Sequence, residues 1–180
     1  MKATGIVRRI DDLGRVVIPK EIRRTMRIRE GDPLEIYTDI NGEVIFKKYS
    51  LVGELASFAT QYCDVLYRST NLPTIICDRD HVIAVSGLAK KEILDRRVST
   101  DLERIMENRE QFVASDSHTL IPVEGIQRKA LVASPIIGAG DISGAVIFFE
   151  NTEGSDAAPS QTEIKLAQVA SSFLGKQMEE

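Results

Sequence analysis

The stretch "GRVVIPKEIRR", residues 14–24, joins a strand-forming sequence directly to a basic one. Its three β-branched residues, 16–18, favour a strand. Pro19 follows at once, and proline suits the start of a helix because its missing N–H has no partner to lose there. Arg23 and Arg24 come about one turn later. The stretch therefore predicts a short strand that ends at a proline and continues as a basic helix.

The neighbouring sequence extends this pattern to the first fifty residues. Residues 5–10, "GIVRRI", predict a strand that turns back at 11–14, because Asp favours turn starts and Gly accepts a positive φ. Asn41-Gly42 is a strong hairpin signal between two strand-like segments. The predicted elements are strands at 5–10 and 15–18, a helix from Pro19 to about Arg27, and strands at 33–38 and 43–48.

A unit of this size has difficulty folding alone. Domains of about fifty residues bury little surface and often need a metal, disulfides or a partner. The first fifty residues contain no cysteine and no metal-ligand motif. We therefore expect obligate oligomerisation, as a dimer whose strands interleave.

The remainder of the chain predicts an α+β domain, an antiparallel sheet flanked by helices at both ends. Within the first expected helix, 50–70, apolar residues are spaced alternately by 4 and 3: Leu51, Leu55, Phe58, Tyr62 and Val65. Two heptads of this spacing fit a helix–helix seam and an ordinary amphipathic helix equally well. The further predicted elements are strands at 74–80 and 81–87, helices at 88–95 and 101–109, strands at 119–123, 129–137 and 143–150, and a helix at 161–177. The predicted domains are thus 1–50 and 51–180.

Two capping-box sequences mark helix starts, at Thr100–Glu103 and Ser160–Glu163. The second opens the final helix. Its expected apolar stripe contains Ile164, Ala167, Phe173, Leu174 and Met178.

The net charge of −4 is divided unevenly along the chain. Residues 1–50 hold 11 Lys and Arg against 8 Asp and Glu, a balance of +3, whereas residues 51–180 hold 12 against 19, a balance of −7. A basic module on an acidic body is expected where only one end of a protein meets a polyanion. Chance clustering remains the alternative, so the placement of the charges has to decide.

No catalytic or metal-binding pattern stands out. Cys63 and Cys77 lack metal-ligand spacing, and His81 and His118 lie in no metal motif. Phosphate-binding and nucleophile-elbow motifs are missing too, so we expect no enzyme activity and no cofactor. No apolar run approaches the roughly 18–20 residues of a membrane span, and the N-terminus does not resemble a secretory signal. We expect a cytoplasmic protein with two reduced thiols.

Seven arginines are the main candidate residues of the first fifty positions: Arg8, Arg9, Arg15, Arg23, Arg24, Arg27 and Arg29. Arginine makes bidentate contacts to phosphate and guanine that lysine cannot make. The turn at 11–14 should bring Arg15 beside the first two, while Arg27 should share a helix face with Arg23. Ile22 and Met26 should face the core.

A two-fold dimer would double this basic surface and match the symmetry of a DNA operator. The alternative is a solvated basic face. Its partners would be carboxylates of the same segment: Asp11, Asp12, Glu21 and Glu30. Residue chemistry alone leaves both interpretations open.

Residues 1–49 resemble the AbrB-type swapped-hairpin transition-state regulators along their whole length, and "GRVVIPKEIRR" is the most specific part of that resemblance. The resemblance implies that two chains exchange hairpins to form a small β-barrel that binds double-stranded DNA. It further implies contacts by Arg8, Arg15, Arg23 and Arg24, with Arg9 and Lys2 in second rank.

The body, 51–180, is similar to a GAF sensor domain in element order and length. Antitoxins of the same N-terminal fold class carry a disordered tail, whereas this body is expected to fold. An AbrB-type arm with a GAF-like body resembles sporulation regulators of endospore-forming bacteria. This implies a nucleoid-associated regulator of forespore genes, a homotetramer paired through helices 50–70 and 160–177.

Two rival functions remain open. In the first, a GAF-like body binds a small molecule or does redox chemistry, with Cys63 and Cys77 as its best residues, and the N-terminus serves only for dimerisation. In the second, the protein is an antitoxin that binds a toxin. No motif identifies a GAF ligand.

Overall fold

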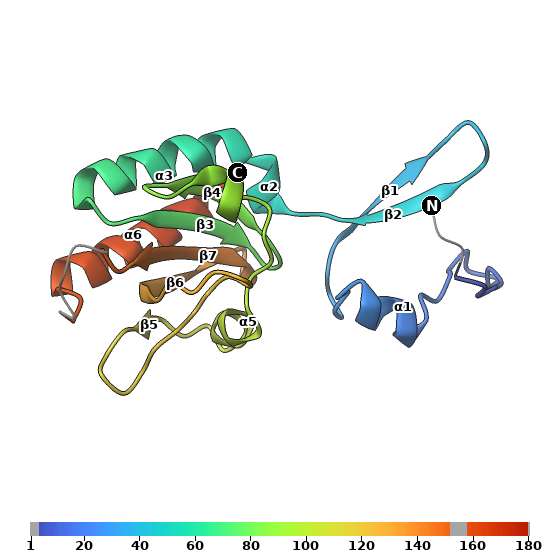
Figure 1. Cartoon of the computed structure of the whole chain (residues 1–180). Helices are drawn as coiled ribbons and strands as arrows, with labels where there is room; N and C mark the ends of the chain where they lie inside the picture. The colour runs from blue at the N-terminus through green and yellow to red at the C-terminus, as the bar shows by residue number, and fades with distance from the viewer. Residues whose placement is uncertain (1–3, 152–157, 180) are drawn as a thin grey trace. The chain divides into compact units, whose positions relative to one another are not determined.

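The computed structural model describes residues 4–151 and 158–179. The chain divides into two compact units, Met1–Tyr49 and Ser50–Glu180 (Figure 1). Each unit has its own sheet.

The N-terminal unit contains one short helix and one hairpin. The helix is α1, Lys20–Thr25, and the hairpin consists of β1, Leu34–Thr38, and β2, Val44–Lys48. The strands are antiparallel, with Leu34 opposite Lys48 and Thr38 opposite Val44. At the hairpin tip, the N–H of Gly42 donates to the carbonyl of Asp39 at 3.2 Å, and Gly42 has a φ of 80°. The predicted Asn41-Gly42 hairpin is confirmed.

The strands predicted at 5–10 and 15–18 are wrong for the single chain, because neither segment is a strand in it. The turn between them does form. Asp11 donates its N–H to the carbonyl of Arg15 and accepts at its own carbonyl from Gly14, both at 3.0 Å. A strand needs a hydrogen-bonded neighbour along its edge, and these two segments have none within the described part of the chain. Val7 and Val17 are 84% and 70% exposed as a result.

The helix α1 is shorter than predicted at both ends. Pro19 is its N-cap residue rather than its first helical residue, with φ −58° and ψ 149°, and its carbonyl accepts from the N–H of Arg23. Arg27 has a φ of 51°, so it has left the helix and does not share a helix face with Arg23. Ile22 is half-buried, but Met26 is 58% exposed, because one chain supplies too little core to cover it.

The C-terminal unit is built on a five-stranded antiparallel sheet with strand order β4-β3-β7-β6-β5. Its strands are β3, Thr74–Asp78; β4, Val82–Ser86; β5, Phe112–Val113; β6, Ala130–Gly138; and β7, Asp141–Phe149. Its helices are α2, Leu51–Glu54; α3, Ala56–Thr70; α4, Lys90–Ile93; α5, Thr100–Glu107; and α6, Gln161–Gln177. The predicted α+β class is confirmed.

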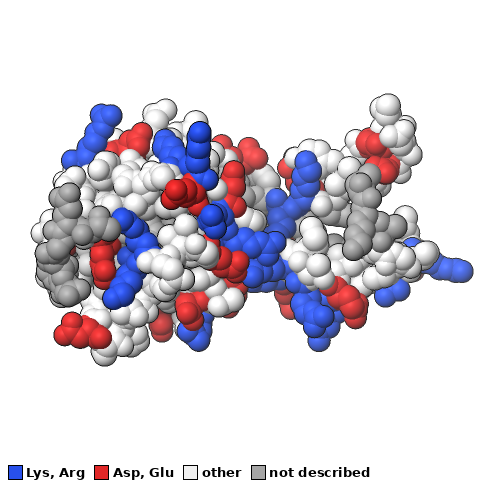
Figure 2. Space-filling view, in the orientation of Figure 1, with Lys and Arg blue, Asp and Glu red and all other residues white. Residues whose placement is uncertain are grey.

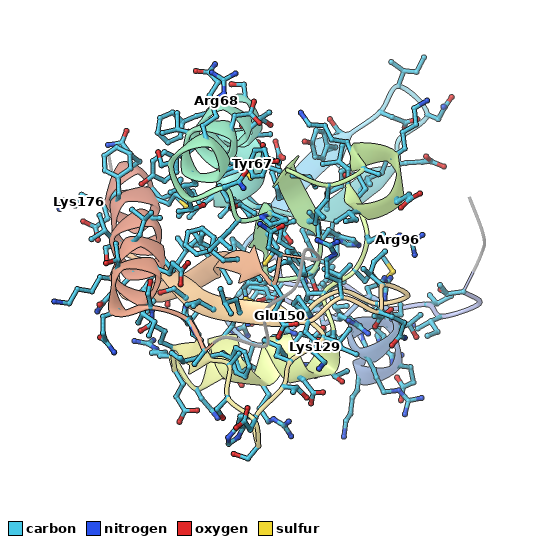
Figure 3. All side chains as sticks on the ribbon, turned by 60° about the vertical axis from the view of Figure 1, so that its left-hand side comes forward. Tyr67, Arg68, Arg96, Lys129, Glu150 and Lys176 are labelled. Carbon is cyan, nitrogen blue, oxygen red and sulfur yellow. The ribbon has the colours of Figure 1, made fainter. Side chains whose placement is uncertain are left out.

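The sheet separates two apolar cores. Alternate residues of a strand point to opposite faces, so Ile75 and Cys77 belong to one core and Ile76 to the other. One core lies beneath α4 and α5, and the other beneath α2, α3 and α6. The helices α3 and α6 lie side by side on their face (Figures 1 and 3).

The helix predicted over 50–70 is interrupted at Leu55, which separates α2 from α3. The face turned to the sheet carries Val52, Ala59, Cys63 and Leu66. The predicted seam residues lie elsewhere: Phe58 and Tyr62 are half-buried, and Leu51 and Val65 are exposed.

The side chains of α3 near its C-terminal end also divide between sheet and solvent. In Figure 3, Tyr67 points toward the sheet while Arg68 points outward. The Tyr67 ring lies against Gly87, where an added Cβ would come within 2.5 Å of it.

Three further expectations need correction. The segment 119–123 is not a strand, since only Val123 forms a bridge, to Val98, and Pro122 has no N–H for a ladder. The short β5 pairs with β6 instead and was not predicted. In α5 the N-cap is Ser99, whose hydroxyl accepts from the N–H of Leu102. The capping box predicted at Thr100–Glu103 is therefore wrong, because the residue at N3 is Leu102, whose side chain cannot accept a hydrogen bond.

The second capping box is confirmed. The hydroxyl of Ser160 accepts from the N–H of Glu163, and the Glu163 carboxylate accepts from the N–H of Ser160 at 2.7 Å. The buried face of α6 differs from the predicted stripe. It includes Ala167 and Leu174 as expected, but Phe173 is 43% exposed and Ala170 is buried in its place.

Candidate nucleic-acid interface

Asp11 organises the turn that presents Arg15. One carboxylate oxygen accepts from the N–H groups of Leu13 and Arg15, at 3.0 and 2.8 Å. The other accepts from Nε of Arg15 at 2.8 Å. The backbone N–H of Arg15, and next its side chain, hold the pKa of the Asp11 carboxyl below its usual value. This ion pair uses only Nε, and the Arg15 side chain is 69% exposed, so its terminal nitrogens can reach a phosphate.

Arg8 and Arg9 are both exposed on the segment that leads into this turn. Nη1 of Arg8 donates to the carbonyl of Val7 at 3.2 Å. Their clustering with Arg15 stays a prediction. Lys2, the remaining predicted contact, lies outside the described residues.

Arg23 and Arg24 lie exposed in the last turn of α1, with Glu21 in its first turn. Cations at a helix C-terminus and anions at its N-terminus are both favoured by the helix dipole. Figure 2 shows basic side chains, in blue, on the side of the N-terminal unit where Figure 1 places α1, with acidic side chains beside them.

The other two arginines of this segment are less exposed, and their backbone atoms take part in a network at the end of α1. Arg27 is half-buried, and its carbonyl accepts from Nζ of Lys48 at 3.0 Å. Arg29 is also half-buried, and its N–H donates to the carboxylate of Asp32 at 2.8 Å. Nζ of Lys48 lies 3.6 Å from the same Asp32 carboxylate. Lys48 of β2 is thereby linked to the residues that follow α1.

Sequence reasoning predicted the turn at 11–14 and the exposed arginines, but it missed that the Asp11 carboxylate itself binds the backbone and Nε of Arg15. A signal was present, because Asp side chains at turn starts commonly accept hydrogen bonds from backbone N–H groups a few residues further along the chain. Lys47 was missed as well; its Nζ lies 4.4 Å from the ring centre of Tyr37 on the paired strand. No sequence motif marks that contact.

The two thiols are poor candidates for chemistry. Cys63 and Cys77 are buried and free. Burial raises the pKa of Cys63 to about 12, with Asp64 adding to the effect, and burial also raises the pKa of Cys77. Thiolate is the reactive form of cysteine, so these environments disfavour the redox alternative.

The histidines and acidic residues form no metal site within the described ranges. His81 is half-buried at the β3–β4 turn, and His118 is exposed. Among the described residues, no helix has the length and apolar character needed to cross a membrane.

Two family models match this chain. A model described as the C-terminal part of stage V sporulation protein T, a transcription factor, matches residues 54–179. A model described as the antidote-toxin recognition protein MazE, a bacterial antitoxin, matches residues 7–51.

One curated relative matches the whole chain, and another matches only its N-terminal part. Stage V sporulation protein T of Bacillus subtilis is 52% identical over 182 residues, covering both chains completely. The transition state regulatory protein AbrB of the same organism is 63% identical over 49 residues, which cover 27% of this chain and 50% of AbrB.

A solved structure supports the fold of the C-terminal unit. A GAF domain from an Acinetobacter phosphoenolpyruvate-protein phosphotransferase is 12% identical, with a TM-score of 0.54, over 73% of this chain and 84% of that one. The AbrB-type and GAF-like resemblances predicted from sequence are thus confirmed. The chain belongs to the stage V sporulation protein T family of transcription factors.

Proposed function

We propose that this protein regulates transcription by binding double-stranded DNA through its N-terminal unit, and that genes of sporulation are among its targets. The observation that carries the proposal is the 63% identity of 49 residues to AbrB, in a segment that exposes arginines at a fixed turn and on α1. The relative that covers the whole chain is named for sporulation. In this proposal the protein acts in the cytoplasm, at the nucleoid, and without catalysis.

The contacting residues in this proposal are Arg8, Arg15, Arg23 and Arg24, with Arg9 and Lys2 secondary. Exposed guanidinium groups hold phosphates bidentately and can read guanine in the major groove. Asp11 contributes indirectly, because it fixes the backbone and Nε of Arg15.

The binding unit in this proposal is a dimer. Segments 5–10 and 15–18 expose apolar side chains and lack strand partners among the described residues of one chain. Pairing with the same segments of a second chain would cover those side chains and complete a small β-barrel. The two-fold axis would then place two sets of arginines at half-site spacing.

We further propose that two such dimers associate through the outer face of α3 and α6. Phe58, Tyr62 and Phe173 form a ring cluster there, with ring centres 5.4 to 6.1 Å apart. Val65 and Val169, on the same two helices, are 56% and 61% exposed. Apolar surface of this kind favours helix pairing between subunits.

Duplex binding by the full-length protein tests the DNA proposal. Arg23→Ala/Arg24→Ala is compared with wild type at two salt concentrations. We expect weaker binding and a salt dependence reduced by about one unit of log–log slope for each phosphate that no longer meets an arginine. Arg128→Ala/Lys129→Ala removes two charges from the C-terminal unit as a matched control; Lys129 is labelled in Figure 3.

Unchanged affinity and unchanged salt slope in the Arg23/Arg24 variant would overturn the assigned contacts. Absence of duplex binding by the wild-type protein would overturn the function itself. Equal losses in both variants would indicate a general charge effect instead of a defined interface.

A further inference from the structure

Arg15 differs from the other exposed arginines of the N-terminal unit because a carboxylate holds its guanidinium group. Its Nε donates to one carboxylate oxygen of Asp11 at 2.8 Å, and its backbone N–H donates to the other at 2.8 Å. Among the described residues, no ion pair engages the remaining exposed arginines of this unit: Arg8, Arg9, Arg23 and Arg24. Arg15 is therefore the arginine whose direction is set by its own chain.

The turn at 11–14 fixes the carboxylate as well as the arginine. The Asp11 oxygen that accepts from the backbone of Arg15 also accepts from the N–H of Leu13, at 3.0 Å. The carbonyl of Asp11 accepts from the N–H of Gly14, and the N–H of Asp11 donates to the carbonyl of Arg15. Most surface ion pairs are weakened by the freedom of two long side chains, and here one closed turn removes part of that freedom.

The engagement of Nε decides which donors of Arg15 face outward. A guanidinium group presents its N–H donors in a rigid planar fork. With Nε bound to Asp11, the parallel pair that remains is at the tip, one N–H from each terminal nitrogen. The side chain is 69% exposed, so this tip is accessible. Such a fork matches the two acceptors, O6 and N7, that guanine presents in the major groove.

The charge of Asp11 distinguishes a base from a phosphate as the partner of this fork. A phosphate is within reach of the tip, but it would also meet the carboxylate, and two anions a few ångströms apart repel each other. The base edge of guanine carries acceptors without a formal charge, so the carboxylate opposes it less. The ion pair therefore favours a base contact at Arg15, whereas Arg23 and Arg24, without such a carboxylate, suit phosphates.

This inference rests on the proposed DNA binding and divides its work among the arginines. We propose that Arg15 reads a guanine, donating from its two terminal nitrogens to O6 and N7 in the major groove, and that Asp11 is its positioning residue. Arg23 and Arg24 hold phosphates. Sequence preference and salt-dependent affinity then depend on different side chains of one surface.

Modified duplexes test the base contact. The full-length wild-type protein first selects its tightest duplex from a random-sequence library. Single guanines of that duplex are then replaced by 7-deazaguanine, which lacks N7, or by inosine, which keeps O6 and N7 and lacks only the minor-groove amino group. We expect a guanine at which 7-deazaguanine weakens binding by about 5- to 10-fold and inosine changes it by less than about 2-fold.

Variants assign that guanine to Arg15 and its direction to Asp11. Arg15→Lys keeps the charge but removes the fork, so it should lose the 7-deazaguanine effect while its salt slope matches wild type. Asp11→Asn should also lose the effect, yet bind random-sequence duplex about 2- to 5-fold more tightly, because a charge that repels phosphate is gone. Asp12→Asn removes the same charge from the next residue and is the matched control, which should keep the 7-deazaguanine effect.

A selected duplex in which no guanine responds to 7-deazaguanine would overturn the inference while leaving DNA binding in place. So would an Arg15→Lys variant that responds as wild type does. Asp11→Asn behaving like Asp12→Asn would overturn the positioning role of Asp11. A wild-type protein that binds no duplex would overturn the proposed function, and this inference with it.

Discussion

Gly144 shows how closely two strands can approach when a side chain is absent. A Cβ at this position of β7 would lie 1.9 Å from the carbonyl oxygen of Cys77 on β3. We predict that Gly144→Ala lowers the free energy of unfolding by about 2–3 kcal/mol, because the backbone must move to admit one methyl group. Urea unfolding followed by circular dichroism measures the change.

Ser143→Ala, next to it on β7, is the control and should change the free energy of unfolding by less than about 0.5 kcal/mol. Wild-type stability in Gly144→Ala would contradict the close approach of β3 and β7.

The Asp11 carboxyl offers a titration test of the turn. Its pKa is lowered chiefly by the backbone N–H of Arg15 and then by the Arg15 side chain. Because the folded-state pKa is depressed, the turn is stabilised above the ordinary carboxyl pKa, and this contribution is lost as the pH falls through the folded-state value. Arg15→Ala should raise the pKa of Asp11 but leave it below 3.8, because the larger contribution from the backbone persists.

Carbon-13 detection of the carboxyl resonance measures this pKa directly. An unchanged pKa in Arg15→Ala would show that the side chain of Arg15 is not held by Asp11.

The buried thiols give a third test at this scale. With the pKa of Cys63 at about 12 and that of Cys77 raised by burial, neither thiol should react with Ellman's reagent at pH 7 in the folded protein. Two thiols per chain should react after denaturation. Rapid reaction of one thiol in the native protein would revive the redox alternative.

At the scale of elements, turns and helix caps that depend on neighbouring residues can be predicted from the sequence. The pairing of strands that are distant in the sequence cannot. The hairpin at Asn41-Gly42 and the cap at Ser160 depend on neighbouring residues, so the sequence predicts both. The apolar content of 119–123 predicts a strand there, but Pro122 has no N–H for a ladder, and the short strand that pairs with β6 is Phe112–Val113.

The candidate sites also differ in how far the sequence predicts them. The exposed arginines follow from a local turn and a short helix and could be placed from sequence. By contrast, a cavity of about 400 Å³ beside β4 is lined by residues of α2, α3, β4 and α4, and no single sequence motif contains them.

The capping box of α6 provides a prediction for an element. Ser160→Ala removes the hydroxyl that accepts from the N–H of Glu163 and should cost about 1 kcal/mol in the free energy of unfolding. Ser172→Ala, exposed within the same helix, is the control and should be neutral or slightly stabilising. Equal free energies of unfolding for the two variants, measured by urea unfolding, would show that the Ser160 hydroxyl does not stabilise the helix start.

For the whole molecule, the proposed oligomerisation would account for the apolar residues that are exposed in both units. In that proposal, segments 5–10 and 15–18 meet one partner surface, and the outer face of α3 and α6 meets another. Sequence spacing left the seam on 50–70 open between two roles. The structure turns other residues of that helix to the sheet and leaves Val65 on the surface.

Val65→Glu/Val169→Glu should therefore convert the proposed tetramer into dimers, because it places charges in the proposed contact. Light scattering after size-exclusion chromatography should show the mass falling from four chains of 20.0 kDa to two. Val113→Glu, on the exposed edge strand β5, is the control. A tetramer that survives the double substitution would place the contact elsewhere.

The junction between Tyr49 and Ser50 has a consequence for how such a chain could arise. The N–H of Tyr49 bonds back to Pro33, whereas the Ser50 hydroxyl accepts from Gly53 ahead of it. The bond of Tyr49 thus lies within the N-terminal unit and the bond of Ser50 within the C-terminal unit. A gene fusion between the codons of these two residues would break neither bond. Recombination there could exchange the arm among proteins with unrelated bodies, and each half could then diverge at its own rate.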